Sequence, residues 1–380
     1  MAAARDERPV GLVFDDRYLT HKTGLALIGD ADPYPFADPV IHPSSPELVG
    51  RAKHLIDLNG IGDRMVRLDA RQATDADLLA YHTPDYLLKV AALSAGDGGE
   101  TGEGAPVGKG GDRVARLSAG GTMAAVDAVL AGGFRAAYAL VRPPGHHALS
   151  DRGMGFCVYA NVVVAARHAQ RVHGAGKVLV VDWDVHHGNG TQDAFWQDPS
   201  VLFVSLHQDS LFPAGSGPVD AVGAGDGRGF TVNVPLPGGT GNAGYRLAFE
   251  QVVAPIARQY GPDVVIISAG QDASVMDPLA RMAVTLDGYR EMTRQLMAVA
   301  DATCGGRVVV SQEGGYAAAY APYCTTAIAE TLVGLPEGAT PVADPYGGRA
   351  ATLPASVGFG LDAERAVEQA VATQRAYWSL

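Results

Sequence analysis

Short runs of apolar, often β-branched residues alternate with longer amphipathic stretches along most of the chain. The runs have the length of strands, and the longer stretches repeat their apolar positions at helical spacing. The expected strands cover residues 10–14, 136–141, 178–181, 201–206, 230–235, 264–267 and 308–311. The expected helices cover residues 117–130, 160–172, 245–260 and 289–302, and a C-terminal helix covers about 361–377.

Continuous apolar strands that alternate with helices are typical of a parallel sheet covered on both faces. The pattern therefore predicts a three-layer α/β fold, which we expect to form a single domain over residues 1–380 with its motifs between about 11 and 334. A glycine-rich stretch, residues 94–111, interrupts the pattern. A loop of this length is either a disordered connector or the rim of an active site.

The composition excludes several classes of protein. With 47% hydrophobic and 18% charged residues, the chain is too apolar to be disordered as a whole. A net charge of −12 argues against nucleic acid as the main partner, because phosphate binding needs a basic face. No signal peptide or membrane span is expected, and three widely spaced cysteines indicate neither disulfides nor a thiolate metal site. We therefore expect a cytoplasmic protein.

Candidate chemistry follows the apolar runs, where ligands bind in open parallel sheets. Four such segments carry polar side chains: residues 142–147 (RPPGHH), 182–190 (DWDVHHGNG), 268–272 (SAGQD) and 312–316 (QEGGY). Any one of them could be a set of turn and capping residues. Four together favour a functional site at the carboxyl edge of the sheet.

The second of these segments predicts a metal site. In extended chain, residues two apart share a face, so Asp182, Asp184 and His186 point the same way. Two carboxylates crowded away from water are costly unless a cation neutralises them. With Asp272 from a neighbouring strand end, Asp184 and His186 supply three ligands and leave a fourth position for water, as in catalytic metal centres.

Two other segments supply groups that move protons or stabilise charge. His146 and His147 follow a rigid Pro-Pro-Gly turn, and imidazoles exchange protons near neutral pH. Tyr316 follows two glycines, and a phenol can donate a hydrogen bond to a developing oxyanion. A metal, a base and an oxyanion donor together predict amide hydrolysis.

These motifs, with 205–207 (SLH) and 277–279 (DPL), resemble the zinc-dependent histone deacetylase family, and within it the bacterial class II-like amidohydrolases. The resemblance implies an arginase/deacetylase-type fold with a mainly parallel eight-stranded sheet. It also implies a hydrolase of linear amides that removes acetyl or related acyl groups from ε-acyl-lysine or similar amines. A homodimer or homotetramer is compatible with it.

The resemblance implies roles for individual residues. One catalytic zinc ion would be held by Asp184, His186 and Asp272. His146, steadied by Asp182, and His147 would form a dyad in which His147 is the general base and then the acid. Further implied positions are the carbonyl-polarising Tyr316, the class II residue Asn189, and the walls of a substrate tunnel, Gly155, Phe156 and Phe212.

The family also holds structural potassium. A first potassium ion would be bound by Asp182, Asp184, His186, Ser205 and Leu206. A second would be bound by Phe195, Asp198, Val201 and Phe230.

Several points stay open in the sequence. Gln271, next to Asp272, either packs behind the site or alters substrate choice, and Glu100 or Glu103 could be an acidic rim residue. Histidines that stand alone in their stretch, including His168 and His173, are expected in core or surface roles. The alternative functions are an acetylpolyamine amidohydrolase, a two-manganese ureohydrolase, which would want a further aspartate in the third segment, and a non-catalytic binding relative.

Overall fold

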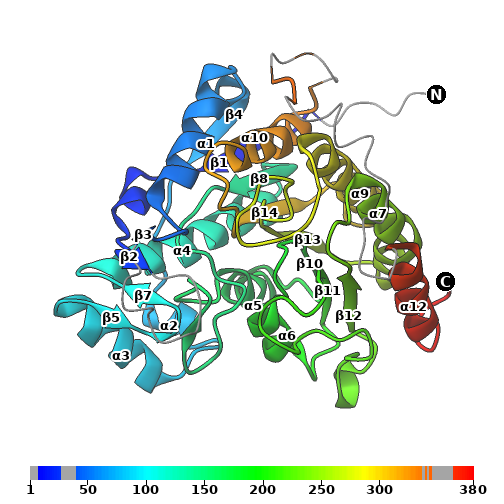
Figure 1. The fold of residues 1–380 in the computed structure, drawn as a ribbon, viewed down its shortest axis with the longest axis horizontal. Coiled ribbons are helices and arrows are strands. Elements are labelled where there is room, and N and C mark those ends of the chain that lie inside the picture. Colours follow the sequence, from blue (N-terminus) through cyan, green and yellow to red (C-terminus); the bar gives the residue numbers. More distant parts are fainter. Residues whose placement is uncertain (1–6, 27–39, 336–338, 340–341, 345–362) are drawn as a thin grey trace.

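Eight strands form one parallel sheet at the centre of the molecule (Figure 1). The computed structural model describes residues 7–26, 40–335, 339, 342–344 and 363–380. Across the sheet the strands are β12 (Thr231–Leu236), β11 (Val201–Gln208), β10 (Val178–Asp182), β13 (Val264–Ala269), β14 (Val308–Gln312), β8 (Ala136–Ala139), β1 (Val10–Val13) and β4 (Met65–Leu68). The predicted α/β class and eight-stranded sheet are confirmed.

Helices cover both faces of this sheet (Figure 1). One layer contains α4 (Gly111–Leu130), α5 (Asn161–His173) and α6 (Asn189–Phe195). The other contains α1 (Pro46–Leu58), α7 (Asn242–Ala248), α8 (Ala254–Tyr260), α9 (Leu286–Cys304) and α10 (Ala321–Leu332). Because both faces are covered, the central strands are buried along their whole length, which explains their unbroken apolar sequences.

Further helices lie outside these two layers. α2 (Asp75–Leu78) and α3 (Pro84–Ala95) precede the glycine-rich stretch, and α12 (Ala363–Gln374) packs against β12 at the edge of the sheet. The C-terminal helix was expected to run to residue 377, but it ends at Gln374; residues 361 and 362 lie outside the described part of the chain. No helix in the described ranges is both long and apolar enough to cross a membrane.

The strand β4 was not predicted, because its pattern is that of an exposed edge. Met65 is buried, whereas Val66 and Arg67 are exposed. The pairing with β1, which joins Val10 to Met65, forms the eighth position of the sheet. A strand of this kind carries too little apolar periodicity to stand out from a loop.

The glycine-rich stretch is folded and reaches the site edge of the sheet. It contains the short strands β5 (Gly99–Glu100), β6 (Gly102–Glu103) and β7 (Pro106–Val107). β6 pairs with β9 (Gly153–Met154), directly before Gly155. Of the two interpretations of residues 94–111, the rim of a site therefore agrees with the structure. The helix α4 also begins at Gly111, earlier than the expected residue 117.

Candidate active site

The four polar segments identified in the sequence lie at one edge of the sheet. Residues 182–190 continue from β10, residues 268–272 from β13 and residues 312–316 from β14, while residues 142–147 follow β8. These four strands are parallel neighbours, in the order β10, β13, β14, β8. Their carboxyl ends therefore meet at the same place, and the segments converge there.

Asp184, His186 and Asp272 form a compact buried group at this edge. Their ligand atoms all lie within 4.8 Å of one another. His186 Nδ1 lies 3.1 Å from Asp184 Oδ1 and 3.2 Å from Asp272 Oδ2. The structure thus brings together the three residues expected to hold a metal ion.

The ionisation of this group is strongly perturbed because water is excluded. Burial raises the pKa of Asp272, and the adjacent charge of Asp184 adds to the effect. Burial alone would lower the pKa of His186, but its bonds to the two carboxylates raise that pKa to about 10. A positive charge is therefore strongly stabilised between the two acids. Two carboxylates and one imidazole are a donor set that fits a divalent cation such as zinc.

Two glycines let the backbone approach the carboxylates closely. A Cβ atom at Gly270 would overlap Asp184 Oδ2, and one at Gly314 would overlap Asp272 Oδ2. The Gly314 N–H donates to Asp184 Oδ2 at 2.9 Å, and the Val185 N–H donates to Asp272 Oδ1 at 2.8 Å. These bonds orient both acids, leaving one oxygen of each directed at His186.

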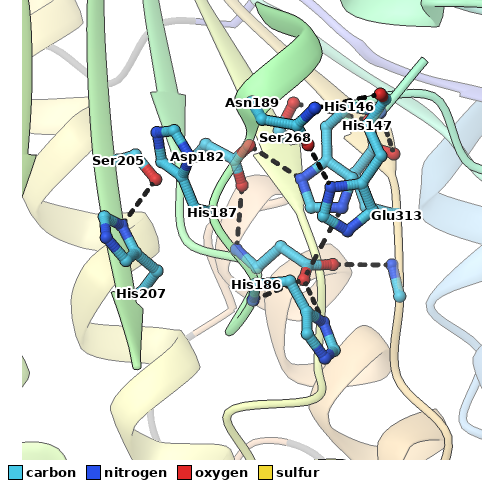
Figure 2. Close-up of polar contacts among 12 residues, drawn as sticks. His146, His147, Asp182, His186, His187, Asn189, Ser205, His207, Ser268 and Glu313 are labelled. Carbon is cyan, nitrogen blue, oxygen red and sulfur yellow. Dashed lines mark hydrogen bonds and ion pairs between the residues drawn. The ribbon is translucent and has the colours of Figure 1, made fainter. Parts of the chain in front are cut away.

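The two histidines of the RPPGHH segment stack beside this group (Figure 2). Their ring centroids are 3.9 Å apart. His146 Nδ1 lies 3.0 Å from Asp182 Oδ2, and His147 Nδ1 lies 2.8 Å from Asn189 Oδ1. The expected pairing of His146 with Asp182, and the position of Asn189 beside His147, both agree with the structure.

The two imidazoles have opposite tendencies. Burial lowers the pKa of His146, but the charges of Asp184 and Asp182 outweigh it and raise that pKa well above the usual value. Burial also lowers the pKa of His147, and there the neighbouring His146 and His186 lower it further. His146 therefore holds a proton readily, while His147 is kept neutral and able to accept one.

Tyr316 reaches the same group from the loop after β14. Gly314 lies against both the Tyr316 hydroxyl and the Asp272 carboxylate. A Cβ atom built at this glycine would be 2.8 Å from the hydroxyl oxygen and would overlap Asp272 Oδ2. The ring of Tyr316 is 6.3 Å from that of His186. Burial raises the pKa of the phenol, and the charges of Asp272 and Asp184 raise it further, so the hydroxyl keeps its proton and can donate it in a hydrogen bond.

The three residues expected to wall a tunnel surround His147 and Tyr316. The ring of Phe212 lies edge-on to His147 at 5.1 Å, and the ring of Phe156 lies edge-on to Tyr316 at 5.6 Å. Gly155 has φ 50°, and a Cβ atom there would overlap His147. Only glycine fits this position, because the chain must pass directly over the imidazole.

Sequence reasoning missed two carboxylates that position this machinery. Glu313 Oε2 accepts the backbone N–H groups of Gly145 at 2.6 Å and His146 at 3.2 Å, and so holds the turn that carries the dyad. Asp277 Oδ2 accepts the backbone N–H of Tyr316 at 2.6 Å. Both residues lay within quoted motifs, but the backbone groups that they bind are remote in sequence.

The residues expected to bind a first potassium ion lie on β10, β11 and the loop after β10. Asp182 and Ser205 are register partners on these strands. Asp182 Oδ1 accepts the Asp184 N–H at 3.0 Å, and the Ser205 hydroxyl lies 3.0 Å from His207 Nδ1. Leu206, the next residue of β11, is buried.

The residues expected to bind a second potassium ion gather at the start of β11. The N–H of Asp198 donates to the carbonyl of Phe195 at 3.0 Å, and the N–H of Val201 donates to that of Asp198 at 3.4 Å. The carbonyl of Phe230 accepts the N–H of Phe203. The carboxylate of Asp198 is already paired with the guanidinium of Arg167 at 2.6 Å.

Gln271 points away from the metal-ligand group. Its Nε2 donates to the Ala269 carbonyl at 2.7 Å, and its Oε1 accepts from Gln312 at 2.6 Å and from Thr325 at 3.0 Å. All of these bonds are buried. The packing interpretation of Gln271 therefore agrees with the structure better than a direct contact with substrate.

The structure distinguishes the two rim glutamates. Glu100 is folded back, because its Oε2 accepts the Ala105 N–H at 2.8 Å within its own loop. Both glutamates are exposed, but the backbone carbonyl of Glu103 also accepts the N–H of Gly155 at 2.9 Å. Glu103 therefore lies beside the glycine that passes over His147.

Comparisons with known proteins find similar sequences. Residues 42–332 match the family model described as "Histone deacetylase domain". The chain is 44% identical to the "Histone deacetylase-like amidohydrolase" of Pseudomonas aeruginosa over 86% of its length and 87% of the relative's. It is 36% identical to a "Probable deacetylase" of Archaeoglobus fulgidus over 85% of its length and 86% of the relative's.

A solved structure shares the fold. It is described as "Crystal Structure of HDA15 HD domain", and it superimposes with a TM-score of 0.84 at 36% identity. The match covers 98% of this chain and 95% of the other.

The glycine at position 314 tests the metal-ligand group. If this group holds a divalent metal ion such as zinc, we expect Gly314→Ala to lower the affinity by about 10- to 100-fold, because the new methyl group displaces Asp272 and disturbs the hydrogen bond to Asp184. Zinc content after dialysis against a graded chelator buffer measures the effect. Gly133→Ala is the matched control, since open space surrounds that position. Equal zinc retention by the two variants would contradict the assignment.

Proposed function

Because this chain belongs to the histone deacetylase family, we propose that it is a zinc-dependent deacetylase of the class II-like type. It would act on linear amides and remove acetyl or related acyl groups from ε-acyl-lysine or similar amines. The observation that carries the proposal is the convergence of the Asp184, His186 and Asp272 group with His147 and Tyr316 at one buried place.

Asp184, His186 and Asp272 would hold the zinc ion, which when bound acidifies water and polarises a carbonyl group. Gly155, Phe156 and Phe212 would enclose the apolar stem of the acylated side chain above it. This arrangement would leave the amide carbonyl between Tyr316 and the ligand group and keep bulk water away.

The residues of the chain would then move the protons. Asn189 Oδ1 accepts from His147 Nδ1, which leaves His147 Nε2 free to take a proton from the attacking water. Tyr316 would donate a hydrogen bond to the carbonyl oxygen as charge develops on it. The protonated His147 would then give its proton to the leaving amine, while Asp182 holds His146 in place.

The remaining expectations about ions and compartment belong to this proposal. We propose that potassium binds beside Asp182 and Ser205, because the buried charge of Asp182 and the backbone of β11 lie together there. The second site is a weaker candidate, since Arg167 already neutralises Asp198.

The three free, buried cysteines suit a reducing compartment such as the cytoplasm.

A turnover panel tests the proposed activity. Acetyl-, trifluoroacetyl- and longer acyl-lysine peptides are incubated with the protein before and after removal of metal by a chelator. We expect turnover of at least the acetyl or trifluoroacetyl substrate, its loss after chelation, and its return with one equivalent of zinc. Full activity of the metal-free protein would overturn the proposal.

An acetylpolyamine amidohydrolase is the second candidate. The net charge of −12 and the exposed Glu103 at the rim favour a cationic substrate. Acetylputrescine and an acetyl-lysine peptide are compared in the wild-type protein and in Glu103→Gln, with Glu100→Gln as the control. A higher kcat/KM for acetylputrescine would favour the second candidate.

Tyr316 is tested by removing its hydroxyl. We expect Tyr316→Phe to lower kcat by about 10²- to 10³-fold, the usual cost of losing one oxyanion donor. KM should change little, because the ring remains in place. Tyr323→Phe on α10 is the matched control. If Tyr316→Phe turned over acetyl-lysine at the wild-type rate, the role given to the phenol would be wrong.

The pH profile tests His147. Asn189→Asp places a carboxylate beside His147 Nδ1, which favours the imidazolium and raises the pKa of His147. Because the neutral form accepts the proton, the acid limb of the kcat/KM profile should move to higher pH, by about one unit. Asn59→Asp, at the end of α1, is the control. An unmoved limb, or one shifted to lower pH, would contradict the assignment.

A further inference from the structure

A second cluster of potential metal ligands joins α4 to α5. Among the described residues, Asp127, His168 and His173 place one ligand atom each within 4.8 Å of the others. Asp127 lies near the end of α4, and the two histidines lie in the last two turns of α5. This cluster could not be recognised in the sequence, because the three residues come from two helices that meet only in the folded protein.

Both imidazoles present the same atom to one carboxylate oxygen. His168 Nε2 lies 2.5 Å from Asp127 Oδ1, and His173 Nε2 lies 2.7 Å from the same oxygen. The two rings are nearly perpendicular, with centroids 5.6 Å apart. Two Nε2 atoms and a carboxylate oxygen are the borderline donors that bind zinc and related divalent metals.

The cluster is enclosed on one side and open on the other. The side chain of His168 is 6% exposed, that of His173 is 18% exposed and that of Asp127 is 40% exposed. An ion entering from solvent could keep water in its remaining positions. The other oxygen of Asp127 faces Arg71, whose Nε lies 4.0 Å away, so the competing cation is on the far side of the carboxylate from the imidazoles.

This cluster is separate from the candidate active site. His173 ends α5 just before β10 begins at Val178, whereas Asp184 and His186 follow the end of β10. The two ligand groups therefore lie at opposite ends of the parallel strands, the second cluster at the amino end and the candidate active site at the carboxyl end. A ligand of one cannot contact the other.

We propose that Asp127, His168 and His173 form a second site for a divalent transition metal, with zinc as the reference ion. For binding, each imidazole carries its proton on Nδ1, so that the lone pair of Nε2 is free to hold the metal, and the ion then ties the ends of α4 and α5 together. The site is weaker than the candidate active site, because His168 Nδ1 is buried without a hydrogen-bond partner that would orient the ring. Because the bound ion stabilises the native state, it should raise the free energy of unfolding, and the metal-free protein should lack this gain.

The proposal is tested by counting zinc and cobalt ions. Metal-free protein is titrated with zinc in a calorimeter and with cobalt, whose visible absorption reports nitrogen and oxygen ligands. We expect two equivalents for the wild-type protein, a tight one and a weaker one. His173→Gln should lose the weaker equivalent, and His186→Ala should lose the tighter equivalent while retaining the weaker one.

Controls separate this site from surface binding and from misfolding. His54→Gln, at an exposed position on α1, should keep both equivalents. His173→Gln should keep wild-type turnover with one equivalent of zinc, which shows that it is folded. In the wild-type protein, but not in His173→Gln, the second equivalent should raise the melting temperature. One equivalent in the wild type, or two in His173→Gln, would overturn the proposal.

Discussion

The burial of two carboxylates beside one imidazole is the constraint on which the rest of the site depends. Asp184 and Asp272 are both fully buried, and negative charge shared between buried acids needs compensation. The protein supplies part of it through the N–H groups of Gly314 and Val185 and through His186. The negative charge that these groups leave uncompensated favours the binding of a cation. The same crowding explains why Gly270 and Gly314 are glycines, since a Cβ atom at either position would push the acids apart. It also explains why the pKa of His186 is raised.

The parallel sheet brings the residues of this site together. Four neighbouring strands end at the same edge, so residues from four distant segments arrive together without long loops. The same geometry separates the two dyad members electrically. The charges of Asp184 and Asp182 raise the pKa of His146, whereas burial, with the neighbouring His146 and His186, lowers the pKa of His147. Burial and the nearby charges thus act in opposite directions on His146 and in the same direction on His147.

Much of this arrangement could be predicted from the sequence because it depends on local spacing. The alternation in Asp182, Asp184 and His186, and the position of each polar segment after an apolar run, already place the ligands at one edge. Other features depend on contacts between remote segments. Glu313 and Asp277 act on backbone groups, which no sequence pattern records. The exposed strand β4 lacked periodicity, and the glycine-rich stretch could be assigned to the rim only through its pairing with β9.

The two ligand clusters also show why a donor set alone does not define a catalytic centre. Both offer carboxylate and imidazole, but only the first has its acids held by backbone N–H groups and a phenol and a neutral imidazole beside it. Beyond the two imidazoles, the charged neighbour of Asp127 is Arg71, and the carboxylate is partly exposed. In the described part of the chain, the phenol and the imidazole that could donate or accept a proton lie beside the first cluster. An ion bound at Asp127 would therefore hold two helices together, whereas the group at the carboxyl edge has the arrangement that the proposed catalysis needs.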